Sequence, residues 1–400
     1  MLREFLRKQI FERFPLVFGA ASGAAAAILV AWLIALRSGP HAIPMGALGI
    51  VGIGAAAIGA WGVPRLTVLA RTSAIASRIE RPLFASGFVL IALAATVVGA
   101  TAAFGALAAL LAVVGLSPDA GLALLRTGTL FAVSGVGAAL VWGFHVEGRL
   151  IEVTHHRIEI AGLAPALRGR RIAHLSDLHI GNGLDGERLA ALVLRVNALG
   201  ADLVALTGDL FDNDAQILPE GARILGRLRA PLGVYAVLGN HDLFVGAELV
   251  ASALAEHAPE ISLLRGHWAV IPTPQPLLVA GLDDPGHDWE GDAEALASLE
   301  KLAAARPFEG PSILLAHRPE AFPLAAALGF SLVLSGHYHG GQVALPLAGG
   351  RLNIARLLTR FDRGLHRIGG SALYVSRGLG YAGPRLRVAS RPEIALLELA

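Results

Sequence analysis

The sequence predicts an N-terminal α-helical transmembrane region followed by a C-terminal α/β domain, and three observations support this fold class. Residues 16–144 consist almost entirely of Ala, Gly, Leu, Val and Ile, and they give the chain its mean hydropathy of +0.60. The remainder has the charge content of a globular domain, and in it strand-length apolar runs alternate with amphipathic helical segments. A length of 400 residues also exceeds one ordinary core. We therefore expect a helical region over residues 1–147 and an α/β domain over residues 148–400.

The charge and the cysteine content exclude several classes of protein. The formal net charge of +2 is too small to indicate a nucleic-acid partner. The chain contains no cysteine, so it has neither a disulfide nor a thiolate ligand for a metal. This absence does not decide between a reducing and an oxidising compartment. No feature of the sequence indicates an obligate protein partner.

Four apolar stretches in the first region are long enough to cross a bilayer, which takes roughly 20 helical residues. Because the third stretch is long for one span, Gly99 and Gly105 could let it kink, tilt or break into two. A signal peptide in place of the first span is disfavoured, because no cleavage site is visible and further spans follow. The length of the four stretches and their near absence of charge also disfavour the interpretation that they are buried helices of a soluble protein. The stretches are Leu16–Leu36, Ala42–Gly62, Leu83–Gly115 and Gly128–Phe144.

Basic residues in the short loops predict how the spans are oriented. The N-terminal tail and the second loop are rich in Lys and Arg, whereas the first loop holds only Arg37. The tail and the second loop should therefore face the cytoplasm. With four spans in an inner (plasma) membrane, the C-terminal domain faces the cytoplasm too, whereas three or five spans would place it outside. The basic residues are Arg3, Arg7, Lys8 and Arg13 in the tail and Arg65, Arg71, Arg78 and Arg81 in the second loop.

The second region begins with a strand directly after the last span. The alternating segment at residues 149–160 predicts this strand, and no Gly/Ser-rich or Pro-rich linker precedes it, so the domain should lie close to the membrane. Helical patterns follow at residues 186–199, 219–230 and 246–258, and residues 371–380 and 391–400 indicate two closing strands. Five apolar runs between these segments predict buried strands at residues 170–177, 201–209, 233–240, 311–317 and 330–337.

A short polar motif ends each of these five buried strands. As candidate metal ligands the motifs supply two carboxylates, an amide and four histidines, and they also contain His241, which could act as an acid, and Asp242. Side chains just past strand ends converge on one rim of a sheet, where α/β proteins build their sites. Such oxygen and nitrogen ligands suit two adjacent divalent metal ions. The motifs are Asp177-Leu178-His179, Gly208-Asp209, Gly239-Asn240-His241-Asp242, His317 and Gly336-His337-Tyr338-His339.

This ordered set of motifs resembles the calcineurin-like metallophosphoesterase superfamily, and the resemblance covers about residues 151–400. It implies a two-sheet α/β sandwich flanked by helices. It also implies a hydrolase with two divalent metal ions, for which Mn is the expected metal and Fe or Zn would also suit the ligands. Two cations ~3.5–4 Å apart neutralise a phosphodiester, lower the pKa of a bridging water and hold the leaving oxygen.

The same resemblance implies a role for each motif residue. Asp209 would bridge the two metals, because a carboxylate has two oxygens and a full negative charge. His241 would protonate the leaving alkoxide, and Asp242 would either orient the His241 imidazole or only cap the following helix. The first metal would be held by Asp177, His179 and His339, and the second by Asn240, His317 and His337.

Departures from the family motifs narrow the substrate class. Asn213 stands where phosphoprotein phosphatases carry Arg, and Asp242 replaces their Glu, which disfavours that activity. The Gly-His-x-His-Gly-Gly-Gln run and Ser376–Gly380 instead resemble the bacterial membrane-associated phosphodiesterase branch, although Tyr338 replaces its usual Thr. Some members of that branch cleave the pyrophosphate of UDP-2,3-diacylglucosamine. We therefore expect a membrane-anchored phosphohydrolase that cleaves a phosphodiester or pyrophosphate bond, with a lipid-linked substrate and membrane lipid as its partners.

Two other functions compete with this expectation. A membrane sensor or transport-associated protein with a regulatory, phosphoesterase-derived domain is disfavoured, because degenerate domains lose ligands and this ligand set is complete. A DNA nuclease is disfavoured by the membrane spans and the near-neutral second region. Three residues outside the motifs also need an interpretation. His174 is expected in the core, and Asp283 and Asp284 either contact substrate or belong to a turn.

Overall fold

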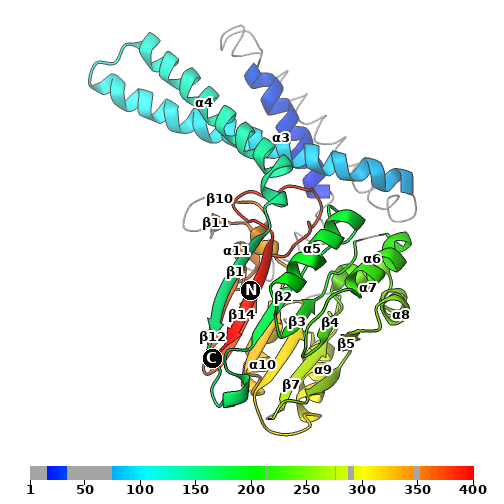
Figure 1. Cartoon of the computed structure of the whole chain (residues 1–400). Helices are drawn as coiled ribbons and strands as arrows, with labels where there is room; N and C mark the ends of the chain where they lie inside the picture. Colours follow the sequence, from blue (N-terminus) through cyan, green and yellow to red (C-terminus); the bar gives the residue numbers. More distant parts are fainter. Residues whose placement is uncertain (1–15, 34–73, 213, 275, 287–291, 346–351) are drawn as a thin grey trace. The chain divides into compact units, whose positions relative to one another are not determined.

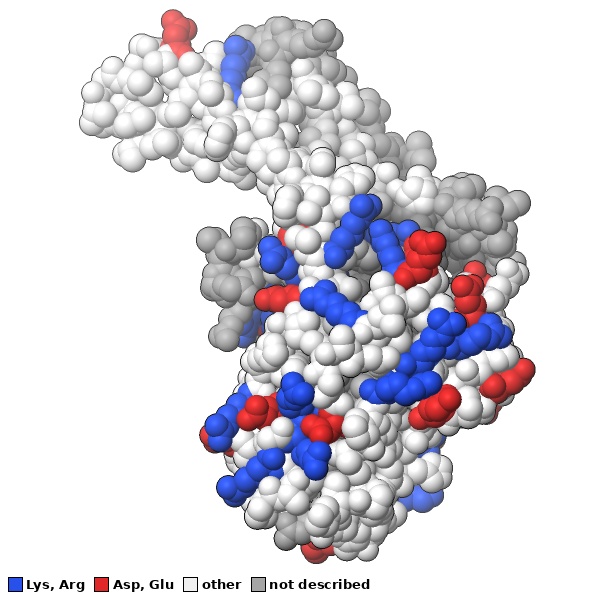
Figure 2. All heavy atoms as spheres, in the orientation of Figure 1, with Lys and Arg blue, Asp and Glu red and all other residues white. Residues whose placement is uncertain are grey.

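The computed structural model describes the chain except for residues 1–15, 34–73, 213, 275, 287–291 and 346–351. The chain divides into two compact units, Met1–Val146 and Glu147–Ala400. The described part of the first unit is helical, and the second unit holds both large β-sheets (Figure 1). On the face drawn in Figure 2, very few charged side chains belong to the described residues of the first unit, whereas they are common on the second.

Three helices in the described part of the first unit are long and apolar enough to cross a membrane. They confirm the expectation of an N-terminal helical membrane region. The second expected span, residues 42–62, lies outside the described residues. The three helical spans are Leu16–Leu33, Pro82–Val113 within α3 (Ala74–Val113), and Pro118–Arg149, which contains α4 (Pro118–His145).

One detail of these helices agrees with the expectation and one differs from it. Helix α3 runs unbroken through Gly99 and Gly105, so the third apolar stretch forms one helix and not two. Helix α4 begins at Pro118 and not near Gly128. It begins there because the Ser117 side chain accepts a hydrogen bond from the backbone N–H of Ala120, and proline suits the first helical position.

The second unit contains two six-stranded sheets that pack face to face. The first has the order β1 (Glu152–Ile158), β14 (Glu393–Leu399), β2 (Arg171–Leu175), β3 (Leu203–Thr207), β4 (Val234–Val237) and β5 (Ile261–Leu263). The second has the order β12 (Gly364–Ile368), β13 (Ser371–Val375), β9 (Leu332–Ser335), β8 (Ser312–Ala316), β7 (Leu277–Leu282) and β6 (His267–Ile271).

The central strands of the two sheets are buried on both faces, which explains why these strands are continuous apolar runs. In β3, Leu203 and Ala205 belong to the core between the sheets, and Val204 and Leu206 belong to the core under the helices. This four-layer arrangement confirms the expected two-sheet sandwich. The first sheet is covered by α5 (Gly186–Ala198), α6 (Leu218–Leu225) and α8 (Ala247–His257), and the second by α9 (Ala293–Ala304) and α10 (Phe322–Ala327).

Strand direction brings the five motif loops to one rim of the sandwich. Strands β2, β3 and β4 run parallel in the first sheet, and β7, β8, β9 and β13 run parallel in the second. Three small elements complete the rim: helix α7 (Asn240–Val245), helix α11 (Ala355–Leu358), and a hairpin of β10 (Ala344–Leu345) and β11 (Leu352–Asn353).

Candidate metal centre

The seven expected ligands follow the carboxyl ends of five strands. Three strands of the first sheet and two of the second therefore contribute side chains to one place, although the motifs are far apart in sequence. The ligands are Asp177 and His179 after β2, Asp209 after β3, Asn240 after β4, His317 after β8, and His337 and His339 after β9.

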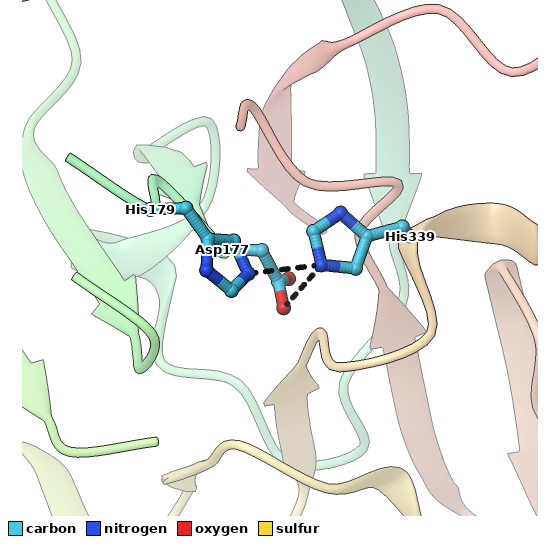
Figure 3. Close-up of side chains that lie close together, drawn as sticks. All are labelled: Asp177, His179 and His339. Atoms are coloured by element: carbon cyan, nitrogen blue, oxygen red, sulfur yellow. Dashed lines mark hydrogen bonds and ion pairs between the residues drawn. The ribbon is translucent and has the colours of Figure 1, made fainter. Parts of the chain in front are cut away.

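One group of donor atoms comes from Asp177, His179 and His339 (Figure 3). The Nε2 atoms of His179 and His339 lie 3.1 Å apart, and Nε2 of His339 lies 3.5 Å from Oδ1 of Asp177. All three residues are buried. These residues are the expected ligands of the first metal.

A second group comes from Asp209, His317 and His337, and Asn240 joins it. Nε2 of His317 lies 3.3 Å from Oδ2 of Asp209 and 3.3 Å from Nδ1 of His337. The same nitrogen lies 3.2 Å from Oδ1 of Asn240. These residues are the expected ligands of the second metal together with the expected bridge.

Asp209 stands between the two groups. Its Oδ2 atom lies 3.5 Å from Nε2 of His179 in the first group and 3.3 Å from Nε2 of His317 in the second. Its other oxygen accepts a hydrogen bond of 2.8 Å from the backbone N–H of His241, which fixes the carboxylate. One carboxylate oxygen is therefore placed to face both groups.

The spacing of the donor atoms fits divalent cations. Three potential ligand atoms surround Nε2 of His317, and an N–H at this position could donate a good hydrogen bond to only one of them. By contrast, an ion ~2.1 Å from each ligand holds neighbouring ligand atoms ~3.0–3.4 Å apart, which is close to the distances here. The donor set is nitrogen and oxygen without sulfur, which suits Mn, Fe or Zn.

The charges of the site also attract a cation. Burial opposes ionisation of Asp209, yet the imidazoles of His317 and His241 hold the pKa of its carboxyl well below the usual range. Burial likewise opposes protonation of His317, but Asp209 and Asp177 raise the pKa of this imidazole to about 10. The buried carboxylates thus stabilise a positive charge on the His317 ring. A metal ion that binds there displaces a proton.

The opposite nitrogens of two ligand histidines face acceptors. Nδ1 of His317 donates to the backbone carbonyl of Thr207 at 2.8 Å, which leaves its Nε2 lone pair for a metal. Nδ1 of His179 lies 3.5 Å from Oδ1 of Asp212. A carboxylate or carbonyl behind a histidine fixes the ring and strengthens it as a ligand.

Two buried arginines lie behind the remaining histidines. Arg318 places Nη1 3.0 Å from Nε2 of His337, and Arg387 places Nη2 3.3 Å from Nδ1 of His339. Burial lowers the pKa of both imidazoles well below the usual value. The charge of Arg318 lowers the pKa of His337 further, and His179 and Arg387 do the same for His339. Both rings are thereby kept neutral, as metal ligation requires.

Most of the expected ligands have a strained backbone. Non-glycine residues rarely adopt positive φ, and each such residue costs about 1–3 kcal/mol. Such strain persists only where the surrounding structure imposes it, and it concentrates at functional sites. The five ligands with positive φ are Asp177 at 51°, His179 at 43°, Asp209 at 49°, His337 at 74° and His339 at 51°.

Two motif glycines leave room for the carboxylates. A Cβ atom on Gly239 would collide with Oδ1 and the backbone nitrogen of Asp209. A Cβ atom on Gly336 would collide with Oδ2 of Asp177 and the hydroxyl of Ser176. These glycines therefore let the backbone approach the carboxylates of both groups closely.

Sequence reasoning assigned no role to Asp212, which lies beside the expected acid. Its Oδ1 atom is 3.4 Å from Nδ1 of His241 and 3.5 Å from Nδ1 of His179. Burial lowers the pKa of His241, but Asp209 and Asp212 outweigh burial and raise it above the ordinary value. Asp212 thus links the acid to the first group, and its place in the Gly-Asp-x-x-Asp motif was the available signal.

The hydrogen bonds of Asp242 favour the second of its two interpretations, a helix cap. Its carboxylate accepts hydrogen bonds from the backbone N–H groups of Leu210, Phe211 and Gly239, at 3.1, 3.0 and 2.9 Å. Asp242 is the third residue of α7, where a side chain turns back to cap the helix. The alternative interpretation, a helix cap, therefore describes it, and Asp212 stands behind His241 instead.

Comparison with known proteins agrees with this geometry. Residues 170–341 match the family model for calcineurin-like phosphoesterases. A metallophosphoesterase of Bacillus subtilis, YkuE, is 31% identical over 283 residues, which cover 69% of this chain and 93% of YkuE. The chain belongs to the calcineurin-like phosphoesterase family. This confirms the expectation of a metal-dependent phosphoesterase domain.

Other relatives of this phosphoesterase combine the domain with a membrane region. A zebrafish (Danio rerio) transmembrane protein with metallophosphoesterase domain is 33% identical over 286 residues, covering 68% of this chain. The match spans 62% of the zebrafish protein's own length. Among solved structures, a dimetal phosphatase from Danio rerio matches 55% of this chain and 91% of its own, with a TM-score of 0.33 and 14% identity.

Tyr338, the departure from the usual Thr, has a defined place in the phosphoesterase. Its hydroxyl donates to Oε1 of Glu320 at 2.8 Å, and its ring meets the His337 ring edge-on, with centroids 4.8 Å apart. Thr359 donates to the same Glu320 oxygen at 2.8 Å. Tyr338 therefore joins the histidine loop to the segments that follow β8 and α11.

The acids of the loop after β7 pair with arginines of the phosphoesterase. Oδ2 of Asp284 accepts from Nε of Arg318 at 2.8 Å, and Oδ2 of Asp283 accepts from Nε of Arg265 at 2.6 Å. Asp284 is buried, and Arg318 in turn reaches His337. Of the two interpretations left open, the structure therefore favours a structural role for Asp284 behind the second group.

Proposed function

We propose that the protein is a membrane-anchored dimetal phosphohydrolase that cleaves a phosphodiester or pyrophosphate bond. The position of Asp209 carries this proposal, because one of its oxygens faces both groups of donor atoms. Mn is the metal we expect from the family, and Fe or Zn would also suit ligands without sulfur. The first ion would be held by Asp177, His179 and His339, the second by Asn240, His317 and His337, and Asp209 would serve both.

The chain's own residues would handle the leaving group. Two cations in the site would supply charge neutralisation of the phosphate and a more acidic water. His241 is 20% exposed, and its ring centroid lies 4.6 Å from that of His179, so it borders the first group and can reach a substrate. Oδ1 of Asp212 lies 3.4 Å from Nδ1 of His241, and Nε2 would donate a proton to the departing oxygen.

We further propose that the substrate is lipid-linked, because the catalytic unit follows the last apolar helix along the chain with no linker between them. Helix α4 ends at His145, and the Gly148 that soon follows is so close to Tyr381 that a Cβ atom would collide with its hydroxyl. Gly380, which directly precedes Tyr381, packs against Leu178 and against His179, a member of the first group. A catalytic unit that begins directly after an apolar helix suits a substrate that stays at the bilayer.

The proposed setting is a bacterial inner membrane with the catalytic domain in the cytoplasm. The basic residues of the N-terminal tail and the second loop support this orientation when the chain has four spans. The substrates to test first are phosphorylated lipids with a nucleotide or sugar headgroup, for example UDP-2,3-diacylglucosamine.

Hydrolysis by the purified full-length protein in detergent tests the proposal. The panel contains a chromogenic phosphodiester, a chromogenic phosphomonoester and UDP-2,3-diacylglucosamine, each with Mn²⁺ or with a chelator. We expect turnover of the diester and the lipid pyrophosphate, loss of turnover on chelation, and recovery with Mn²⁺. Undiminished turnover after metal removal, or no turnover of any substrate, would show the proposal to be wrong.

A further inference from the structure

An exposed apolar surface lies directly after the histidine loop. The hairpin β10–β11 pairs Leu345 with Leu352 and Ala344 with Asn353. Residues directly opposite in an antiparallel pair share a face, and so do residues two apart along a strand. Val343 and Ile354 therefore lie on the same face as Leu345 and Leu352. With Leu357 of α11, three residues after Ile354, they form a surface that we name the hairpin patch.

The hairpin patch is uncovered in the described part of the chain. Its five large apolar side chains are between 40% and 66% exposed, whereas Ala344 on the opposite face is 4% exposed. The buried face is held in place by backbone hydrogen bonds, from Ala344 N–H to Val388 and from Val388 N–H to Gln342. Contiguous exposed apolar side chains on a fixed element mark an interaction surface.

The exposed charged side chains of the segment that carries the patch are arginines, and the neighbouring acid, Asp362, lies 3.8 Å from Nε of Arg356 but is buried. Residues 343–361 contain three arginines and no acidic residue. Of these, Arg356 and Arg360 lie in the described part of the chain and are exposed. Arg385, also exposed, lies next to Pro384, whose carbonyl accepts from the Gln342 side chain beside the hairpin. Large apolar side chains flanked by arginine are the composition that binds an anionic membrane surface.

We propose that the hairpin patch docks on the anionic surface of the membrane in which the helices of this chain lie. The apolar side chains would enter the boundary between headgroups and acyl chains, and the flanking arginines would meet the lipid phosphates. Figure 1 shows the hairpin and α11 beyond the ends of the two large sheets, the end at which the strands deliver the ligands. Docking there would hold the metal centre at the headgroup layer.

This inference rests on the proposed membrane anchoring but not on the proposed metal chemistry, so its test reads position and not turnover. The chain has no cysteine, so one introduced cysteine can be labelled cleanly in the full-length protein. Leu352→Cys samples the patch. Val270→Cys is the matched control, an exposed apolar position that pairs with Leu278 near the start of β7, at the opposite end of the sheet from the site.

Each variant is labelled with a polarity-sensitive bimane and placed in nanodiscs of phosphatidylcholine and phosphatidylglycerol, with or without brominated lipid. We expect the Leu352→Cys label to shift to the blue and to be quenched by brominated lipid, and the Val270→Cys label to do neither. Arg356→Glu with Arg360→Glu should weaken the quenching only when phosphatidylglycerol is present. Ile354→Cys repeats the measurement at a second patch position if Leu352→Cys does not fold.

Two outcomes would overturn the proposal. Equal quenching at Leu352→Cys and Val270→Cys would show that the patch does not approach the bilayer. A blue shift at Leu352→Cys that is insensitive to brominated lipid and grows with the number of protein copies per disc would show that a second copy of the chain covers the patch instead.

Discussion

Asp209 shows how much of the site depends on one side chain. Its oxygen Oδ2 faces His179 and His317 at 3.5 and 3.3 Å, and its oxygen Oδ1 is fixed by the backbone of His241. Its own backbone is strained at a φ of 49°, and Gly239 leaves the space that it fills. The bridging role that we propose for Asp209 therefore has a direct consequence for metal content.

Asp209→Ala should remove both metals and activity together, because both ions depend on this carboxylate. We expect the turnover of a chromogenic phosphodiester to fall roughly 1,000-fold or more, since metal ions supply several kcal/mol of transition-state stabilisation. Metal analysis by mass spectrometry, alongside the rate, checks this. Asp214→Ala, at an exposed acid nearby, is the control that should change neither.

His241→Ala separates the acid from the metal ligands. We expect both metals to remain and turnover to fall by ~10²–10⁴, which is the usual contribution of a general acid. An Asp209 variant that still holds two metals, or a His241 variant that loses them, would contradict the assigned roles.

Asp212 is the residue for which structure and sequence reasoning differ most. Asp212→Asn keeps the shape of the side chain but removes the charge that faces Nδ1 of both His179 and His241. We expect a loss of roughly 10–100-fold in metal affinity or turnover, as for other groups behind a metal ligand. Metal titration and the rate with excess Mn²⁺ measure the two effects separately, and a variant unchanged in both would show that Asp212 plays no part.

At the scale of elements, strand β14 joins several parts of the catalytic unit through one buried acid. Glu393, at the start of β14, accepts from Thr154 of β1 at 2.6 Å and from Tyr374 of β13 at 2.7 Å. Its second oxygen accepts from the backbone N–H of Arg377 at 3.0 Å. Burial raises the pKa of Glu393, but Arg377 and these hydrogen bonds outweigh it and hold the pKa below the usual value.

Glu393→Ala should therefore destabilise the catalytic unit. Removing one partner of a buried ion pair costs about 3–5 kcal/mol, which lowers Tm by roughly 10 °C in a domain of this size. Because the folded pKa lies below the unfolded one, this contribution is present at neutral pH and is lost as pH falls through the folded pKa. Thermal unfolding measures it, and Glu398→Ala, at an exposed position of the same strand, should change little.

The sequence was informative about elements wherever both local pattern and burial agreed. The five motif strands are recognisable because strands buried on both faces are continuous apolar runs. Strands β6 and β12 have many exposed positions and lie at the sheet edges, so they lack that signal. The sequence left two interpretations of Asp242 open, because proximity to His241 does not reveal that the third residue of α7 turns back toward Gly239.

At the scale of the whole molecule, the apolar helices should matter more for a lipid-linked substrate than for a soluble one. If the substrate is lipid-linked, a shortened chain that starts at Val146 should lose the reaction on UDP-2,3-diacylglucosamine far more than the reaction on a soluble phosphodiester. Rates for the full-length and shortened proteins in the same detergent micelles measure this. Equal loss on both substrates would mean that the helices serve only to stabilise or localise the enzyme.

The central claim is that two divalent ions share Asp209 and together carry out phosphodiester hydrolysis. The most direct test is to strip the full-length protein of metal, titrate it with Mn²⁺, and follow bound metal and turnover of a chromogenic phosphodiester together. The account predicts that turnover rises until two Mn²⁺ are bound per chain and does not rise further. Full turnover with one bound ion or none would contradict it.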